Sequence, residues 1–238
     1  MTPSDEKDQI RREVWDTLET EGLARFPFPP HGRIPNFEGA AEAASAVSEL
    51  EWWDDARVIK SNPDAPQRYV RERALRAGKE VVMAVPRLGT KRPFLRIDPR
   101  HLDHPGDAAT ISGAKEFGDP HAVNELPAVD AIVAGSVAVD ETGRRIGKGE
   151  GYSDLEFAML LEYDRIDREL PIVTTVHEVQ VSPSPLPTDA HDVPLDWIVT
   201  PVRTIRTRER PSRPAGIDWN QLSDERLEEI PALESLAE

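Results

Sequence analysis

The run VDAIVAGSVAVD, residues 129–140, limits the possible fold more than any other part of the sequence, because it is almost entirely apolar and rich in β-branched residues. A run of this kind is typical of a strand buried on both faces, as found in parallel sheets that helices cover on both sides. Helix-like and strand-like segments alternate around it. The run therefore predicts an inner strand of an α/β fold.

A βαβ unit precedes this run, since two short apolar segments enclose a helix-like segment that Gly78 ends. RFPFPPHGRIPNF, residues 25–37, is too rich in proline for regular structure and predicts an ordered loop. Together the segments predict a three-layer α/β sandwich with a mostly parallel central sheet flanked by helices. The expected strands are 56–60, 80–86, 129–140, 172–181 and 196–201. The expected helices are 4–24, 39–50, 67–78 and 153–166.

The sequence divides near Arg206, where it becomes polar and contains several prolines. Residues 1–207 are predicted to form the α/β domain. Residues 208–238 include the acidic stretch DERLEEIPALESLAE and predict a peripheral or partly disordered C-terminal tail.

Composition excludes several classes of protein. The net charge of −15 opposes a general nucleic-acid-binding surface, so no nucleic acid partner is expected. The chain has no cysteine, which excludes disulfides and thiolate chemistry. Without an apolar run of roughly 18 residues, neither a membrane partner nor a secretory signal is expected, and a cytoplasmic location is predicted. The excess of acidic residues is typical either of adaptation to high salt or of an acidic protein from an ordinary cytoplasm.

The stretch RIGKGEGYSDLEFAM, residues 145–159, places three glycines between the apolar run and a helix-like segment. Gly147, Gly149 and Gly151 would let the backbone approach phosphate oxygens, and the helix that follows presents unpaired N–H groups. The stretch is neither a Walker A loop nor GxGxxG. It predicts either a phosphate-binding loop or a tight turn, with Asp154 as a magnesium or ribose ligand or as a helix cap.

Charged residues elsewhere allow two interpretations each. Lys7 and Arg11 lie four residues apart and so share a face of the first helix, as a solvated face or as a phosphate clamp. His191 and Asp192 precede an expected strand, where they form either a loop hydrogen bond or part of a site at the sheet edge.

Three segments together resemble the 5-formyltetrahydrofolate cyclo-ligase (methenyltetrahydrofolate synthetase) family. That family has an N-terminal Lys with an Arg four residues later, an Arg-Leu-Gly-Tyr-Gly-Gly-Gly-Tyr-Tyr-Asp loop and a late His-Asp-x-x-x-Asp-x-x-x-Thr. The HGRIPNF and RIGKGEGYSDLE runs are similar to a subgroup, the methenyltetrahydrofolate synthetase domain-containing proteins. The matching positions are Lys7, Arg11, Arg145 through Asp154, His191, Asp192, Asp196 and Thr200.

The resemblance implies an enzyme that uses ATP and Mg²⁺ to convert 5-formyltetrahydrofolate into 5,10-methenyltetrahydrofolate, with release of ADP and phosphate. Phosphoryl transfer needs positioning and charge neutralisation more than covalent chemistry, which suits basic residues and glycines. By resemblance, Arg145 and Lys148 are catalytic, Asp154 binds the metal, and Asn62 and Tyr152 contact the folate substrate. The implied nucleotide-binding residues are Lys7, Arg11, Gly147, Gly149, Gly151, Tyr152, Asp154 and Asp192.

The chain also departs from the family pattern. Lys148, Glu150, Ser153 and Leu155 stand where the family loop has Tyr, Gly, Tyr and Arg, and the folate-contacting region reads SNPDAP here. Glu150 brings a carboxylate near the expected phosphates, which requires compensation by Mg²⁺, Lys148 or an arginine. Two alternatives to the cyclo-ligase therefore stay open: a nucleotide-binding paralogue acting on another cofactor-pathway metabolite, and a non-catalytic nucleotide-binding or interaction protein.

Overall fold

The computed structural model describes residues 3–236 and places an eight-stranded mixed sheet at their centre. The inner strands pair in parallel, and the strands at both edges pair antiparallel to their neighbours. The order across the sheet is β13 (Thr204–Arg206), β12 (Trp197–Val199), β10 (Ile172–Thr175), β7 (Ala131–Ala134), β3 (Val58–Ser61), β4 (Glu80–Ala84), β5 (Phe94–Ile97) and β6 (Asp119–His121).

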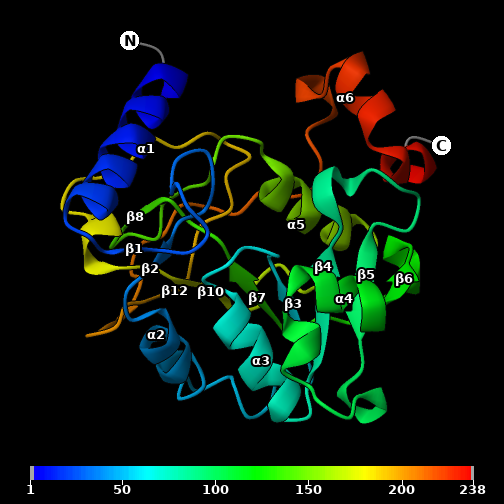
Figure 1. Cartoon of the computed structure of the whole chain (residues 1–238). Helices are drawn as coiled ribbons and strands as arrows, with labels where there is room; N and C mark the ends of the chain where they lie inside the picture. The colour runs from blue at the N-terminus through cyan, green and yellow to red at the C-terminus, as the bar shows by residue number, and fades with distance from the viewer. Residues whose placement is uncertain (1–2, 237–238) are drawn as a thin grey trace.

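Helices cover both faces of this sheet. Successive strand residues point to opposite faces, so Ile59 and Val173 pack on one side while Val58 and Ile172 pack on the other. The first side is covered by α1 (Pro3–Thr20), α2 (Ala40–Val47), α3 (Arg68–Arg76) and α4 (Ile111–Phe117), and the second by α5 (Tyr152–Glu162) and the C-terminal residues around α6 (Asp224–Glu229). Figure 1 shows α2 and α3 together on one side of the molecule and α5 and α6 toward the other. The predicted three-layer α/β architecture is confirmed.

The expected strand over 129–140 is wrong in one respect, because it is two strands in two sheets. β7 belongs to the main sheet, whereas β8 (Ala138–Asp140) pairs with β9 (Arg145–Ile146) and β11 (Val181–Ser182). The chain leaves the main sheet at Gly135, where a Cβ atom would lie 2.6 Å from Asp64 Oδ2 and 3.0 Å from the Ile34 side chain. The expected strand over 172–181 is divided in the same way, into β10 and β11.

The segment after β13 packs against the α5 side of the sheet. Ile230 and Leu233 are 0% and 1% exposed and join the same apolar cluster as α5. Arg213 is buried and forms an ion pair with Asp196. The acidic composition predicted a peripheral or partly disordered tail; the apolar residues within it supply these core contacts, while the division at residue 207 stays a prediction.

The parallel strands bring their carboxyl ends to one edge of the sheet. The loops that follow β3, β4 and β7 begin there, and β9 leads directly into the glycine loop, defined here as residues 147–151, and into α5. In open α/β sheets this edge is where ligands bind. Across residues 3–236, the helices are too short or too polar to cross a membrane.

Candidate active site

A cavity of about 790 Å³ opens at this edge of the sheet. Its walls come from α1, the loop after β3, the end of β4, the glycine loop and residues 189–192. The structure brings together in this one cavity all the residues to which the sequence assigned a role: Lys7, Arg11, Asn62, Arg145, Gly147, Lys148, Gly149, Gly151, Tyr152, Asp154 and Asp192. Their roles stay predictions, but their positions are those of a single site.

Two arginines from opposite ends of the sequence hold the backbone of the glycine loop. Arg11 Nε donates to the Gly147 carbonyl at 2.7 Å, and Arg226 donates to the Glu150 carbonyl at 2.5 Å. Gly151 is the N-cap of α5 and, as a glycine, has no side chain to cap the helix. The first turn of α5 therefore presents backbone N–H groups to the cavity edge, which suits an anion.

Gly149 has the most positive φ of the glycine loop, a backbone conformation that side chains strain. Its φ is +107°, and a Cβ atom would lie 3.4 Å from Arg11 Cζ. We expect Gly149→Ala to lower the free energy of unfolding by about 1–2 kcal/mol, through backbone strain, and to weaken binding of the expected nucleotide, because relief of that strain changes the backbone of the loop. Urea denaturation and ATP titration measure the two effects.

Gly22→Ala is the matched control for this change. Gly22 has a φ of +69° and no heavy atom within 4 Å of the added Cβ, and it lies outside the cavity. The Gly22→Ala variant should have a lower free energy of unfolding and an unchanged affinity for ATP. If both variants lost the same affinity for ATP, general backbone strain would explain the loss, and the shape of the glycine loop would not.

Arg145 and Asp154 link the loop to the sheet and to the segment before β12. Arg145 is 6% exposed and donates to Asp154 Oδ1 at 2.5 Å and to the Gly135 carbonyl at 3.0 Å. The backbone N–H of Val193 donates to the same Oδ1 atom at 3.0 Å. Burial opposes the charge on Arg145, but attraction to Asp154 outweighs it and raises the pKa of the guanidinium. Arg145 therefore stays charged within the cavity wall.

Lys7 is held by carboxylates from a distant loop. Its Nζ atom lies 2.8 Å from Asp189 Oδ2 and 2.5 Å from Asp192 Oδ2. Burial disfavours the ammonium, yet these two hydrogen bonds raise the pKa of Lys7, and the same contact lowers the pKa of Asp189. A cation at the cavity edge is thus fixed in position and in charge.

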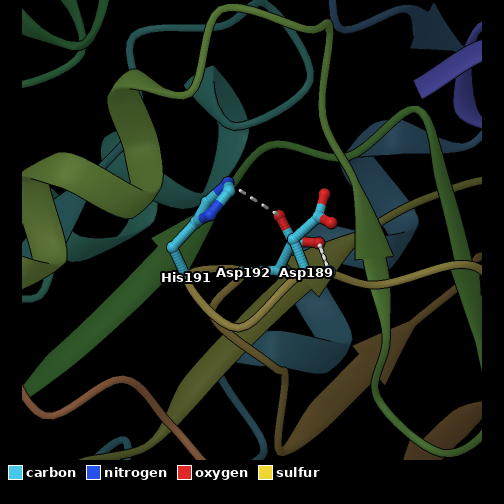
Figure 2. Close-up of side chains that lie close together, drawn as sticks. All are labelled: Asp189, His191 and Asp192. Carbon is cyan, nitrogen blue, oxygen red and sulfur yellow. Dashed lines mark hydrogen bonds and ion pairs between the residues drawn. The ribbon is translucent and has the colours of Figure 1, made fainter. Parts of the chain in front are cut away.

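The same carboxylates and His191 form a group with the ligand types of a metal site. Figure 2 shows the His191 ring directed toward Asp192, and the ligand atoms of Asp189, His191 and Asp192 all lie within 4.8 Å of one another. Because Lys7 already contacts both carboxylates, a metal ion here would have to displace its ammonium group. The group is better explained as the anchor of Lys7.

The floor of the cavity contains charged groups that the sequence analysis did not select. Glu156 lines the cavity and forms an ion pair with Lys60, which lies outside the lining; the two are 4% and 1% exposed. Lys60 also donates to Asn62 Oδ1 at 3.3 Å, as does Ser153. Asp64 lies beside this group, and burial raises the pKa of its carboxyl above 3.8, although Lys148 and Arg71 oppose the rise.

The raised pKa of Asp64 makes stability depend on pH. Between the unfolded value and the raised folded value, the folded protein holds a proton that the unfolded chain releases, so stability falls as the pH rises through this window. We expect Asp64→Asn to raise the melting temperature at pH 8, with a gain that shrinks as the pH approaches 4. Thermal melts across this range test it, with the exposed Asp103→Asn as control. An equal gain at every pH would contradict the explanation.

Comparison with known proteins decides the family. The family model described as the 5-formyltetrahydrofolate cyclo-ligase family matches residues 3–201. The chain belongs to the 5-formyltetrahydrofolate cyclo-ligase family. It is 44% identical over 237 residues to a methenyltetrahydrofolate synthase domain-containing protein of Mus musculus, covering 98% of this chain and 63% of that protein. The Homo sapiens protein of the same name is 39% identical over 234 residues, covering 97% and 61%.

The chain thus spans about three fifths of the length of these curated relatives. Among solved structures, the NMR structure of Aquifex aeolicus 5,10-methenyltetrahydrofolate synthetase has a TM-score of 0.54 and 19% identity, covering 90% of this chain and 98% of that one. At this identity the match supports the fold. The predicted resemblance to the cyclo-ligase family and its domain-containing subgroup is confirmed.

In this cyclo-ligase family member, the structure explains how the loop accommodates the carboxylate of Glu150. Lys148 Nζ lies 2.8 Å from Glu150 Oε2, so the added carboxylate is neutralised within the loop itself. The ion pair with Lys148 is one of the compensations that the sequence analysis expected for a carboxylate near the phosphates. Sequence reasoning missed Asp64, Glu156 and Arg226. Asp64 lies within the SNPDAP segment, which replaces the family's folate-contacting region, and Glu156 is a charge inside an apolar helix, which is a usable signal of a buried pair.

Proposed function

We propose that the chain catalyses the ATP-dependent closure of 5-formyltetrahydrofolate to 5,10-methenyltetrahydrofolate, with release of ADP and phosphate. The observation that carries this proposal is the convergence of the cations Lys7, Arg11 and Arg145 on the glycine loop in one cavity. Phosphoryl transfer is catalysed mainly by positioning and by neutralising charge on the transferred group. The residues at this cavity provide both.

The basic residues differ in what they can do. Lys7, Arg11 and Arg145 are each less than a tenth exposed and are fixed by hydrogen bonds, so they serve as a preformed phosphate clamp. Lys148 is more exposed and is paired with Glu150. We assign Lys148, with Arg145, to the stabilisation of charge that develops on the transferred phosphoryl group.

The folate substrate is assigned to the end of the cavity beyond the loop, near the carboxyl ends of β3 and β4. Asn62 and Asp64 provide amide and carboxyl groups there, and Met83 and Leu95 provide apolar surface for a ring system. Tyr152, the first residue of α5, also lines the cavity. A mixture of apolar walls and a few polar groups is typical of sites for small organic ligands.

Mg²⁺ fits the donor types at this cavity, since the carboxylates are hard oxygen ligands. Asp154 accepts its bonds from Arg145 and Val193 through Oδ1, so Oδ2 would be its ligand atom. When bound with ATP, Mg²⁺ supplies charge neutralisation to the phosphate oxygens. Asp154 would then both hold the metal and keep Arg145 in place.

A second substrate other than 5-formyltetrahydrofolate is the main alternative. It is favoured by the altered loop, in which Lys148 is shared with Glu150, and by the SNPDAP segment that replaces the family's folate-contacting region. On this alternative the nucleotide half of the site works as proposed and the acceptor is another small metabolite.

The deciding experiment supplies purified protein with Mg²⁺, ATP and 5-formyltetrahydrofolate, in low and in multimolar salt because the composition is strongly acidic. Methenyl product is followed by absorbance, and phosphate release is measured in parallel. Product and phosphate in equal amounts, dependent on both substrates, are the expected result. ATP binding without product at either salt concentration would favour the alternative, and absence of both ATP binding and product would reject the nucleotide site.

A further inference from the structure

A second cavity, of about 360 Å³, lies on the far side of the glycine loop. It shares Gly149, Glu150, Gly151, Asp154 and His191 with the larger cavity, so the two meet at the loop. The rest of its wall comes from one face of α5 and from residues 214–226. These C-terminal residues lie outside the region that the family model matches.

The lining of this smaller cavity suits a flat heterocycle with a sugar. Leu155 and Ala158 of α5, together with Ile217 and Leu222 of the C-terminal segment, give the cavity apolar surface. Asp218 adds a carboxylate that accepts hydrogen bonds from hydroxyl or amino groups. Cavities of this size with apolar walls and few polar groups are typical of sites for small organic ligands.

The C-terminal segment is fastened both to the loop and to the core. The Arg226 guanidinium lies 4.1 Å from the centre of the Tyr152 ring and donates to the Glu150 carbonyl at 2.5 Å. Beyond it, Ile230 and Leu233 are buried in the cluster that contains α5. The wall is therefore fixed relative to the glycine loop.

The direction of phosphoryl transfer places the parts of the nucleotide. The acceptor attacks the terminal phosphate from the side opposite the leaving diphosphate, so acceptor and nucleoside must lie on opposite sides of the transferred group. The larger cavity extends from the loop toward Asn62 and Asp64, and the smaller one extends from the loop toward the C-terminal segment. With phosphates at the loop, the nucleoside is directed into the smaller cavity.

We propose that the smaller cavity, walled by α5 and residues 214–226, receives the base and ribose of the nucleotide whose phosphates bind at the glycine loop. This inference rests on the proposed function, because it takes a nucleotide to be the ligand of the loop. It makes the C-terminal segment part of the site, and it assigns Arg226 the role of a positioning residue that joins this segment to the loop.

The test compares two probes on the full chain by calorimetry, Mg²⁺ with ATP and Mg²⁺ with inorganic tripolyphosphate. ATP should bind at least tenfold more tightly than tripolyphosphate, since only ATP reaches the smaller cavity. Leu155→Phe fills the cavity and should weaken ATP binding at least tenfold, while tripolyphosphate binding changes less than twofold. Leu161→Phe, on the same helix and outside both cavities, is the matched control and should change neither.

Hydrogen exchange of the unaltered protein gives a second measurement that needs no variant. ATP should slow exchange at residues 214–226, and tripolyphosphate should not. Equal affinities for the two probes, or equal exchange with both, would overturn this inference and leave the phosphate site standing. If neither probe binds, the proposed function fails and this inference fails with it.

Discussion

Replacing Lys60 with methionine is expected to lower the free energy of unfolding by about 3–5 kcal/mol, because Glu156 would be left as a buried carboxylate without its partner. Both side chains are nearly inaccessible, at 1% and 4% exposure. Lys60 lies on the inner strand β3 and Glu156 on α5, so the pair joins the sheet to the helix that follows the glycine loop. Urea denaturation at neutral pH measures the loss.

The double variant Lys60→Met with Glu156→Leu separates charge from packing. Apolar residues of similar size can replace a buried ion pair at little cost, so most of the lost stability should return. The two single variants and the double variant form a thermodynamic cycle. A double variant that loses the sum of both single losses would show that the two charges do not act as a pair.

Replacing Lys7 with methionine is expected to lower kcat/KM for the proposed ring closure by a factor on the order of 10²–10³, the usual cost of removing one preorganised group that stabilises transition-state charge. The change also leaves Asp189 and Asp192 without their shared cation, and their negative charge would then repel the incoming phosphates. Steady-state kinetics with varied ATP give kcat and KM separately.

Arg12→Met is the control for this variant. Arg12 is an exposed cation on the same helix and does not line the cavity, so its replacement should leave kcat/KM within about twofold, as expected for a surface charge screened by solvent. Thermal melts of both variants distinguish lost chemistry from lost folding. A loss of less than about tenfold in a folded Lys7→Met protein would remove Lys7 from the phosphate clamp.

The sequence predicted the layers of the fold because those depend on local periodicity. Apolar strands alternating with amphipathic helices indicated the parallel sheet, and β3, β4 and α3 lie within a few residues of their expected bounds. The change of sheet at Gly135 could not be predicted, since it depends on the close approach of Asp64 and Ile34 from other parts of the chain. The short strands β5 and β6 carried no comparable pattern and were not expected.

The sequence also predicted most of the site, because most residues marked by the family motifs line one cavity, although Asp196 and Thr200 lie outside its lining. It could not predict the contacts that depend on tertiary structure alone. The stacking of Arg226 on Tyr152 joins positions far apart in the sequence, and nothing near either residue signals it. Likewise, the anchoring of Lys7 depends on Asp189 as much as on Asp192, and only the latter was selected from the motif.

The two arginines that hold the glycine loop have a consequence for the order of events during synthesis. Of the three, Arg11 leaves the ribosome first, the loop follows it, and Arg226 emerges last. Since domains begin to fold from the N-terminus as the chain is made, the nascent protein can form its sheet while one end of the loop still lacks its partner. The glycine loop can therefore be bound at both ends only after residue 226 has been translated and has left the exit tunnel.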